Sequence, residues 1–323
     1  RVHLIKKLLV NFRTISFLLK NLFSRSIQLN YFISLILQIQ PKVVITTTDN
    51  SISFSILTKY FEDKIKFIAI QNGTRGEIYE NTNNINKFLY YSNYMGFSNF
   101  DLELMQKKNI NVKNFFPVGS LTNSYFKKYI QNEKNNNNKN YDICFVSKRI
   151  FENGKAVSSK AAEDSFALLK FLEKYVKKYN KSIVIQSKSK EFNSVENLFL
   201  EKLFLGTNYK ISWMDNVTNF NSYNNISSSR FIVGAPSSLL REASVYPNTK
   251  ILCYNTEKKT GKFPFVGLNI LSEISYEKFE ERLNLIFNLN YEDYIKKLQK
   301  KHEYLMQNTN TIEYFLDFLK KKD

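Results

Sequence analysis

The chain has 323 residues, of which 43% are hydrophobic, so it can bury one large core or two of ordinary size. Its 47 Lys and Arg residues outnumber 29 Asp and Glu residues, and the net charge of +18 predicts attraction to anions such as phosphorylated substrates or acidic lipid. The basic residues are dispersed, and neither a zinc-finger spacing nor an RNA-binding aromatic signature occurs, which argues against nucleic acid as a partner.

The first part of the chain reads as two helices followed by alternating strands and helices. Residues 1–40 place apolar clusters at helical spacing between basic residues, which predicts two helices. From Pro41 the pattern becomes β-α-β, with KVVITTTDN as a buried strand, SISFSILTKYFE as a helix and IKFIAIQNGTRG as a strand with a Gly-containing loop. Further strands are predicted at 88–91 and 114–119, with a helix at 101–108 between them.

A polar, low-complexity tract separates this part from the rest. Residues 132–140, NEKNNNNKN, cannot pack into a core and predict a surface linker between domains 1–131 and 141–323. Beyond it the alternation restarts, with strands in YDICFVSKRI, SIVIQSKSK, YKISWMD, FIV and TKILCYN. A basic, helical tail follows, with helices predicted at 291–304 and 311–322. The sequence therefore predicts an α/β protein with two domains.

The cysteines and histidines limit the chemistry. Cys144 and Cys253 lie in apolar strand-like runs, which is typical of small buried residues, and His3 and His302 lie in Lys-rich stretches near the two ends. They supply no disulfide framework and no metal site, and they favour mechanisms without a histidine base. No apolar run has the length of a membrane span and no signal peptide is evident, which predicts a cytoplasmic protein.

The run SSSRFIVGAPSSLLREA, residues 227–243, combines a short strand, a small turn and a helix start. Ser237 and Ser238 fall where the helix begins, and free backbone N–H groups with the positive end of the helix dipole suit a phosphate there. Glu242 follows Ser238 by four residues, on the same helix face, where a carboxylate can accept hydrogen bonds from ribose. The alternative is an ordinary helix capped by serine.

Other candidates follow from the rule that ligands bind at the carboxyl ends of parallel strands. In the second half the polar residues at such ends are Lys148, Arg149, Gln186 and Lys188, and in the first half they are Asp49, Asn50, Gln71, Asn72, Gly73, Arg75 and Glu77. Lys148 and Arg149 can equally be a solvated strand end, and Asp49 can equally be the N-cap of the next helix.

Three segments, IVGAPSSLLREA, TTTDN and IAIQNGTRG, resemble the GT-B glycosyltransferases of bacterial surface carbohydrate synthesis. The resemblance is greatest to the O-antigen, capsule and lipopolysaccharide enzymes, including those that use CMP-activated Kdo or other nonulosonic acids. It extends more distantly to the CDP-glycerol glycerophosphotransferases of teichoic acid synthesis. It implies two Rossmann-like domains facing across a cleft, a nucleotide-sugar donor for which CMP is favoured, no metal or other cofactor, and a glycan or lipid-linked acceptor.

The resemblance also implies roles for single residues. Ser237 and Ser238 would bind the nucleotide phosphate, Glu242 the ribose, and Lys148 or Arg149 the phosphate charge. Related enzymes often carry His-Pro after the strand that here reads IVIQSKSK, so Lys188 or Lys190 becomes the candidate cation. The teichoic acid relatives place a histidine where Asn72 stands, and because Asn is no base, Asp49 or Glu77 is expected to take the acceptor proton.

Two other functions stay open on the sequence, a CDP-polyol phosphotransferase and a basic α/β binding protein without catalysis. The amphipathic N-terminal region and the Lys-rich tail are also open to two readings. They are either contacts with an anionic membrane, where a lipid-linked acceptor would be presented, or ordinary helices with solvated lysines.

Overall fold

The computed structural model describes residues 11–21, 26–76, 88–131, 139–152, 155–188, 195–213, 220–257 and 262–320. The chain forms two compact units that are discontinuous in sequence. The first unit comprises Arg1–Asn72, Ile78–Met95 and Met105–Phe116, and the second comprises Gly73–Glu77, Gly96–Leu104 and Pro117–Asp323. Of the predicted linker at 132–140, residues 132–138 lie outside the described part, and the domain boundary drawn there stays a prediction.

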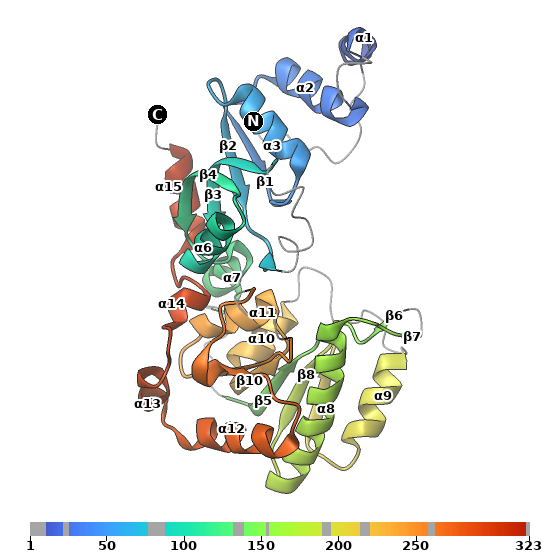
Figure 1. The fold of residues 1–323 in the computed structure, drawn as a ribbon, viewed down its shortest axis with the longest axis vertical. Coiled ribbons are helices and arrows are strands. Elements are labelled where there is room, and N and C mark those ends of the chain that lie inside the picture. Colours follow the sequence, from blue (N-terminus) through green and yellow to red (C-terminus); the bar gives the residue numbers. More distant parts are fainter. Residues whose placement is uncertain are drawn as a thin grey trace. The chain divides into compact units, whose positions relative to one another are not determined.

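The first unit is built on a four-stranded sheet in the order β1-β2-β3-β4 (Figure 1). Strand β1 pairs with β2, and β2 with β3, in parallel. The strands are β1 (Val43–Thr46), β2 (Lys66–Ile70), β3 (Tyr90–Gly96) and β4 (Asn111–Pro117), and the helices are α1 (Phe12–Lys20), α2 (Ile27–Ile39) and α3 (Ile52–Phe61). Helix α6 (Asn99–Lys107) begins in the second unit and ends in the first.

Strand β3 starts two residues later than predicted and runs five residues further, because polar residues inside it are satisfied by the neighbouring strand. The Ser92 hydroxyl and the Asn93 side-chain amide both donate to the carbonyl of Phe67, at 3.1 and 3.0 Å. A polar pair that reads as a loop in the sequence therefore lies within the sheet.

The second unit contains a six-stranded sheet in the order β12-β11-β10-β5-β8-β9. Its strands are β5 (Tyr141–Val146), β8 (Ile183–Gln186), β9 (Tyr209–Ser212), β10 (Ser229–Gly234), β11 (Lys250–Tyr254) and β12 (Ile270–Leu271), and every neighbouring pair is parallel. The chain runs from β5 outward to β9, returns to β10 and continues to β12. This is the strand order of a doubly wound, Rossmann-like sheet, whose order reverses between β5 and β10.

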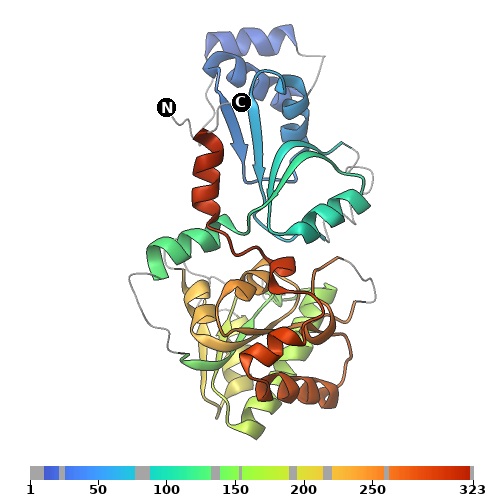
Figure 2. The same ribbon diagram turned by 90° about the vertical axis from the view of Figure 1, so that its left-hand side faces the viewer.

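The second unit also contains helices and a short hairpin (Figures 1 and 2). They are α7 (Leu121–Tyr125), the π-helix η1 (Phe126–Gln131), α8 (Lys160–Tyr179), α9 (Val195–Phe204), α10 (Asn221–Ser227), α11 (Ser238–Glu242), η2 (Ala243–Val245), η3 (Gly267–Asn269), α12 (Tyr276–Asn288), α13 (Tyr291–Lys296), α14 (His302–Leu305) and α15 (Thr311–Lys320), with hairpin strands β6 (Phe151–Glu152) and β7 (Lys155–Ala156). Figure 2 shows α15 close to α7, and Lys128 Nζ of the adjoining η1 lies 2.9 Å from Glu313 of α15.

The sheet separates two apolar clusters. Alternate residues of a strand face opposite sides, so Ile143 and Phe145 join the cluster with α8 and α12, while Cys144 and Val146 join the one with α10 and α11. Both Cys144 and Cys253 are fully buried, as the sequence predicted, and burial raises the pKa of each thiol. These cysteines pack as small hydrophobic residues.

The helix predicted at 291–304 is two helices, α13 and α14. Tyr294 of α13 is buried in the first cluster, where its hydroxyl accepts from the Ile251 N–H at 3.0 Å and donates to Asn269 at 2.6 Å. Leu305 and Met306 are buried in the second cluster, on the opposite face of the sheet. The chain must pass from one face to the other between them, and a continuous helix cannot do so.

Candidate nucleotide site

The reversal of strand order places the ends of β5 and β10 side by side, and glycine permits a close approach there. Gly234 pairs with Val146, and a Cβ atom on Gly234 would lie 2.7 Å from the Val146 carbonyl oxygen. Any larger residue would push the turn after β10 away from β5. Since ligands of doubly wound sheets bind outside the carboxyl ends at the reversal, this is the candidate nucleotide site.

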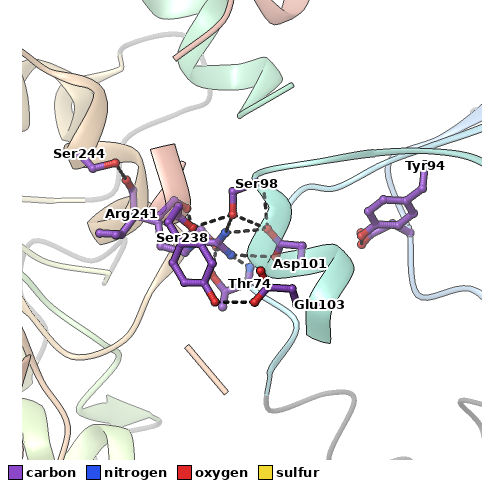
Figure 3. A network of polar contacts seen from close by, with 11 residues as sticks. Thr74, Tyr94, Ser98, Asp101, Glu103, Ser238, Arg241 and Ser244 are labelled. Atoms are coloured by element: carbon purple, nitrogen blue, oxygen red, sulfur yellow. Dashed lines mark hydrogen bonds and ion pairs between the residues drawn. The ribbon is translucent and has the colours of Figure 1, made fainter. Parts of the chain in front are cut away.

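The two serines after this turn have different structural roles. Helix α11 begins at Ser238, as predicted, and Ser237 is its N-cap, with the Oγ atom accepting from the Leu240 N–H at 3.1 Å. The Ser238 Oγ atom accepts from the Thr74 N–H at 2.8 Å (Figure 3). Both side chains are half-buried. The capping alternative therefore holds for Ser237, and the Ser238 hydroxyl meets a loop from far earlier in the chain.

That loop follows β2 and belongs to the second unit. A Cβ atom on Gly73 would lie 3.5 Å from both Arg75 Nη1 and Ser238 Oγ, and one on Gly76 would lie 1.9 Å from the Lys262 carbonyl oxygen. Only glycine allows the second approach. Two residues predicted from the first half of the sequence, Gly73 and Arg75, thus lie beside Ser238.

Three other residues predicted for this loop, Gln71, Asn72 and Glu77, do not lie together with Ser238 in the described part of the second unit. Gln71 is buried and its N–H donates to the Met95 carbonyl at 2.9 Å, whereas Asn72 is exposed. Both belong to the first unit. Glu77 lies outside the described residues, so its role as an alternative base stays a prediction.

Basic residues follow β5 at the same edge of the sheet. Lys148 is half-buried. Burial raises the pKa of the Cys253 thiol in β11, and the nearby charge of Lys148 opposes this effect in part. Arg149 is exposed and lies 2.7 Å from Glu152. Lys148 is therefore the cation nearer to the strands at the reversal, and Arg149 matches the solvated strand end that the sequence left as an alternative.

The end of β8 offers one buried and one exposed candidate. Gln186 is buried, with its side-chain amide donating to the carbonyls of Ser187 and Ser212 and accepting from Asn225 at 2.8 Å. Lys188 is exposed, and Lys190 lies outside the described residues. The amide of Gln186 is thus engaged within the protein, and the contacts of Gln186 and Lys188 with a ligand stay predictions.

Glu242 is buried, with 5% of its surface exposed. It accepts a hydrogen bond of 3.0 Å from the Tyr223 hydroxyl. Burial raises the pKa of Glu242 to about 7, although hydrogen bonds from Ser120 and Tyr223 act in the opposite direction. A carboxyl group in this environment is partly protonated near neutral pH. Its contact with a ribose stays a prediction.

The neighbour of Glu242, Arg241, was missed in the sequence. Its side chain is fully buried, and the guanidinium donates to both carboxylate oxygens of Asp101, at 3.0 and 2.7 Å, and to Ser98 Oγ at 3.2 Å (Figure 3). Its Nε atom donates to the Leu305 carbonyl at 2.8 Å. Arg241 thereby fixes α11 to α6 and to the C-terminal segment. The sequence signal that could have identified this buried arginine was its position within the apolar run SLLREA.

In the first unit, Asp49 is fully buried at the end of β1. Its Oδ2 atom accepts from the Tyr94 hydroxyl at 2.6 Å, and its backbone carbonyl accepts from Tyr91. The next helix is capped by Ser51, whose Oγ atom accepts from the Phe54 N–H at 3.3 Å, so the alternative that Asp49 is the N-cap is wrong. The adjacent Asn50 is half-buried, and catalysis by Asp49 stays a prediction.

The described residues contain no group of three or more His, Cys, Asp or Glu residues that could hold a metal ion. Across the same part of the chain, every helix is too short or too polar to cross a bilayer.

Solved structures with the same fold include enzymes of nucleotide-sugar metabolism. The UDP-GlcNAc 2-epimerase of Neisseria meningitidis, bound to UDP-GlcNAc, is 14% identical with a TM-score of 0.55, over 91% of this chain and 80% of that one. The Methanocaldococcus jannaschii UDP-GlcNAc 2-epimerase, in complex with UDP-GlcNAc and UDP, is 16% identical with a TM-score of 0.52, over 90% and 80%. The sucrose-phosphate synthase of Thermosynechococcus elongatus is 10% identical with a TM-score of 0.51, over 91% and 77%.

No protein-family model and no curated protein matches the chain. The structural likeness shows the fold, an α/β protein with two parallel sheets of the GT-B type, as the sequence predicted. GT-B structures include both glycosyltransferases and UDP-GlcNAc 2-epimerases.

Proposed function

We propose that the chain is a glycosyltransferase that moves a sugar from a nucleotide donor to a glycan or lipid-linked acceptor. The observation that carries the proposal is the juxtaposition of Gly234 with Val146, which brings the Ser237–Ser238 turn beside the end of β5 and its Lys148. A nucleotide leaving group develops negative charge as its bond to the sugar breaks. Fixed N–H and hydroxyl donors with a cation stabilise that charge without a metal.

The roles of the residues follow from their surroundings. Ser238 and the Gly73–Arg75 loop would hold the phosphate, with Lys148 as the counter-charge, while Ser237 shapes the site by capping α11. The acceptor hydroxyl attacks the anomeric carbon, the bond from that carbon to the phosphate oxygen breaks, and the hydroxyl proton passes to a base, for which the sequence favours Asp49 of the first unit. Tyr94, hydrogen-bonded to Asp49, would orient the carboxylate for this step.

The sequence and the solved structures favour different nucleotide bases. The resemblance in the sequence favours CMP, in the manner of surface carbohydrate enzymes, whereas the two solved epimerases hold UDP-GlcNAc. This likeness favours a second candidate function, epimerisation at C2 of a UDP-sugar. The phosphate site would be the same in both cases, because transfer and epimerisation differ in what happens to the sugar.

Calorimetry with CMP, CDP and UDP tests the site, and product analysis tests the reaction. We expect one nucleotide to bind, and the matching sugar nucleotide to release its nucleotide faster when an acceptor glycan is added. Release of glycerol phosphate from CDP-glycerol would support the phosphotransferase, and conversion of UDP-GlcNAc into its 2-epimer would support the epimerase. Binding of none of the three nucleotides would contradict the proposed site.

Matched serine variants locate the phosphate. Ser238→Ala is expected to weaken nucleotide binding by about 1.5–3 kcal/mol, because one hydrogen bond to a charged group is lost. Ser237→Ala should instead lower the free energy of unfolding by about 1 kcal/mol through loss of the N-cap, with a smaller effect on affinity. If Ser238→Ala binds nucleotide as tightly as wild type, Ser238 is not part of the site.

A further inference from the structure

Helix α1 exposes apolar side chains on one face. Phe12, Ile15 and Leu19 are 84%, 46% and 67% exposed. Their spacing of three and four residues places them in one stripe along the helix. A surface helix of a globular protein ordinarily turns such a stripe toward the core, so the exposure of this one calls for an explanation.

The contact between α1 and α2 is made by polar groups. Asn11 donates to the Gln38 side chain at 2.8 Å, and Gln38 in turn donates to Thr14 Oγ1 at 3.1 Å and Ser34 Oγ at 2.8 Å. Thr14 is fully buried, whereas Phe12 on the same turn is almost fully exposed. Helix α1 therefore buries a threonine and half-buries Phe17 and Leu18, while Phe12, Ile15 and Leu19 face outward. Figure 1 shows α1 beyond α2, away from the strands of its unit.

All charged residues in the sequence around α1 are basic. The first 48 residues contain no Asp or Glu and seven basic residues, namely Arg1, Lys6, Lys7, Arg13, Lys20, Arg25 and Lys42. Arg13 and Lys20 are exposed on α1 itself. Arg13 also lines a hollow of about 400 Å³ between α1 and α2, together with Phe17, Ser34, Leu37, Gln38 and Gln40. An outward apolar stripe with only cations around it matches an anionic bilayer surface.

We propose that α1 docks on an anionic lipid bilayer, with Phe12, Ile15 and Leu19 among the acyl chains and Arg13 and Lys20 at the headgroups. A second copy of the chain fits this face poorly, since it would bring the same cations against one another, with no carboxylate in this segment to pair with them. The docking does not depend on the proposed transfer reaction, because it requires only residues of the first unit.

Co-sedimentation of the full chain with vesicles, without nucleotide, tests the proposal. We expect binding to equimolar phosphatidylcholine and phosphatidylglycerol, weaker binding in high salt, and little binding to phosphatidylcholine alone. The variant Phe12→Ser, Ile15→Ser, Leu19→Ser should bind at least about tenfold less, because three apolar side chains no longer enter the bilayer. Arg13→Gln with Lys20→Gln should lose binding to the anionic vesicles while leaving the stripe intact.

A matched control replaces exposed apolar residues elsewhere. Leu198, Leu205 and Ile274 are 64%, 72% and 71% exposed in the second unit, and their replacement by Ser should leave vesicle binding unchanged. Circular dichroism checks that each variant is folded, and nucleotide affinity should be the same in all. Equal binding to both kinds of vesicle, or equal loss in the control, would overturn the proposal. The proposal would also be overturned if the wild-type chain does not bind vesicles but forms an oligomer that the triple Ser variant does not form.

Discussion

Replacing Arg241 by Met tests the buried ion pair that anchors α11. The substitution keeps an unbranched side chain and leaves the Asp101 carboxylate buried, with 3% of its surface exposed. Asp101 Oδ2 would retain hydrogen bonds from the Ser98 N–H and hydroxyl, at 3.0 and 3.3 Å, but lose the bidentate contact with the guanidinium. The Leu305 carbonyl would lose its donor as well.

The expected cost is large because the pair is desolvated. Removing one partner of a buried ion pair costs about 3–5 kcal/mol, which is a large part of the 5–15 kcal/mol that typically stabilises a domain. Replacing both partners, by Arg241→Met with Asp101→Leu, should cost less than the sum of the single changes, because neither charge is then left alone. Arg241→Lys should also destabilise, since an ammonium cannot make the bidentate contact.

Urea unfolding followed by the fluorescence of Trp213 measures these changes. Trp213 is the only tryptophan and packs against the core of the second unit, so it reports on the unit that contains the ion pair. The control is Arg149→Met, which removes an exposed pair and should change stability by no more than about 1 kcal/mol. A cost below about 1 kcal/mol for Arg241→Met, or strict additivity in the double variant, would refute the reasoning.

Three further outcomes are expected. Asp49→Asn keeps an acceptor for Tyr94 but removes the base, so turnover should fall by about 10²–10⁴ with unchanged donor affinity; near-normal turnover would move the base role to Glu77. Glu242 has a pKa of about 7 in the folded chain, above the ordinary value of 4.5. Between these two pH values the folded chain therefore keeps a proton on Glu242 that the unfolded chain has lost. Stability should therefore fall as the pH rises through this window, by at most about 3 kcal/mol relative to Glu242→Gln, as measured by urea unfolding at each pH. Activity should persist in EDTA, and a loss that Mg²⁺ reverses would contradict transfer without a metal.

The alternation of apolar and polar runs determined the class of the fold. Strands such as YDICFV and KILCY have a polar start and then a continuous buried run, because both faces of a parallel sheet are covered, and the sequence shows this locally. The start of α11 was likewise readable, since serine before an apolar run is a cap signal. The separation of α13 from α14 was not readable, because the break depends on which face of the sheet each helix covers.

What the sequence determined by itself is local: which runs are strands, where helix α11 begins, and that the chain is basic. Tertiary structure alone decided which of these residues meet. It brought Thr74 to Ser238, 164 positions apart, and Asp101 to Arg241, 140 positions apart. It also turned Phe12, Ile15 and Leu19 outward. The physical reason is that side-chain periodicity reveals the apolar face of an element, whereas the partner of that face is chosen by packing over the whole chain.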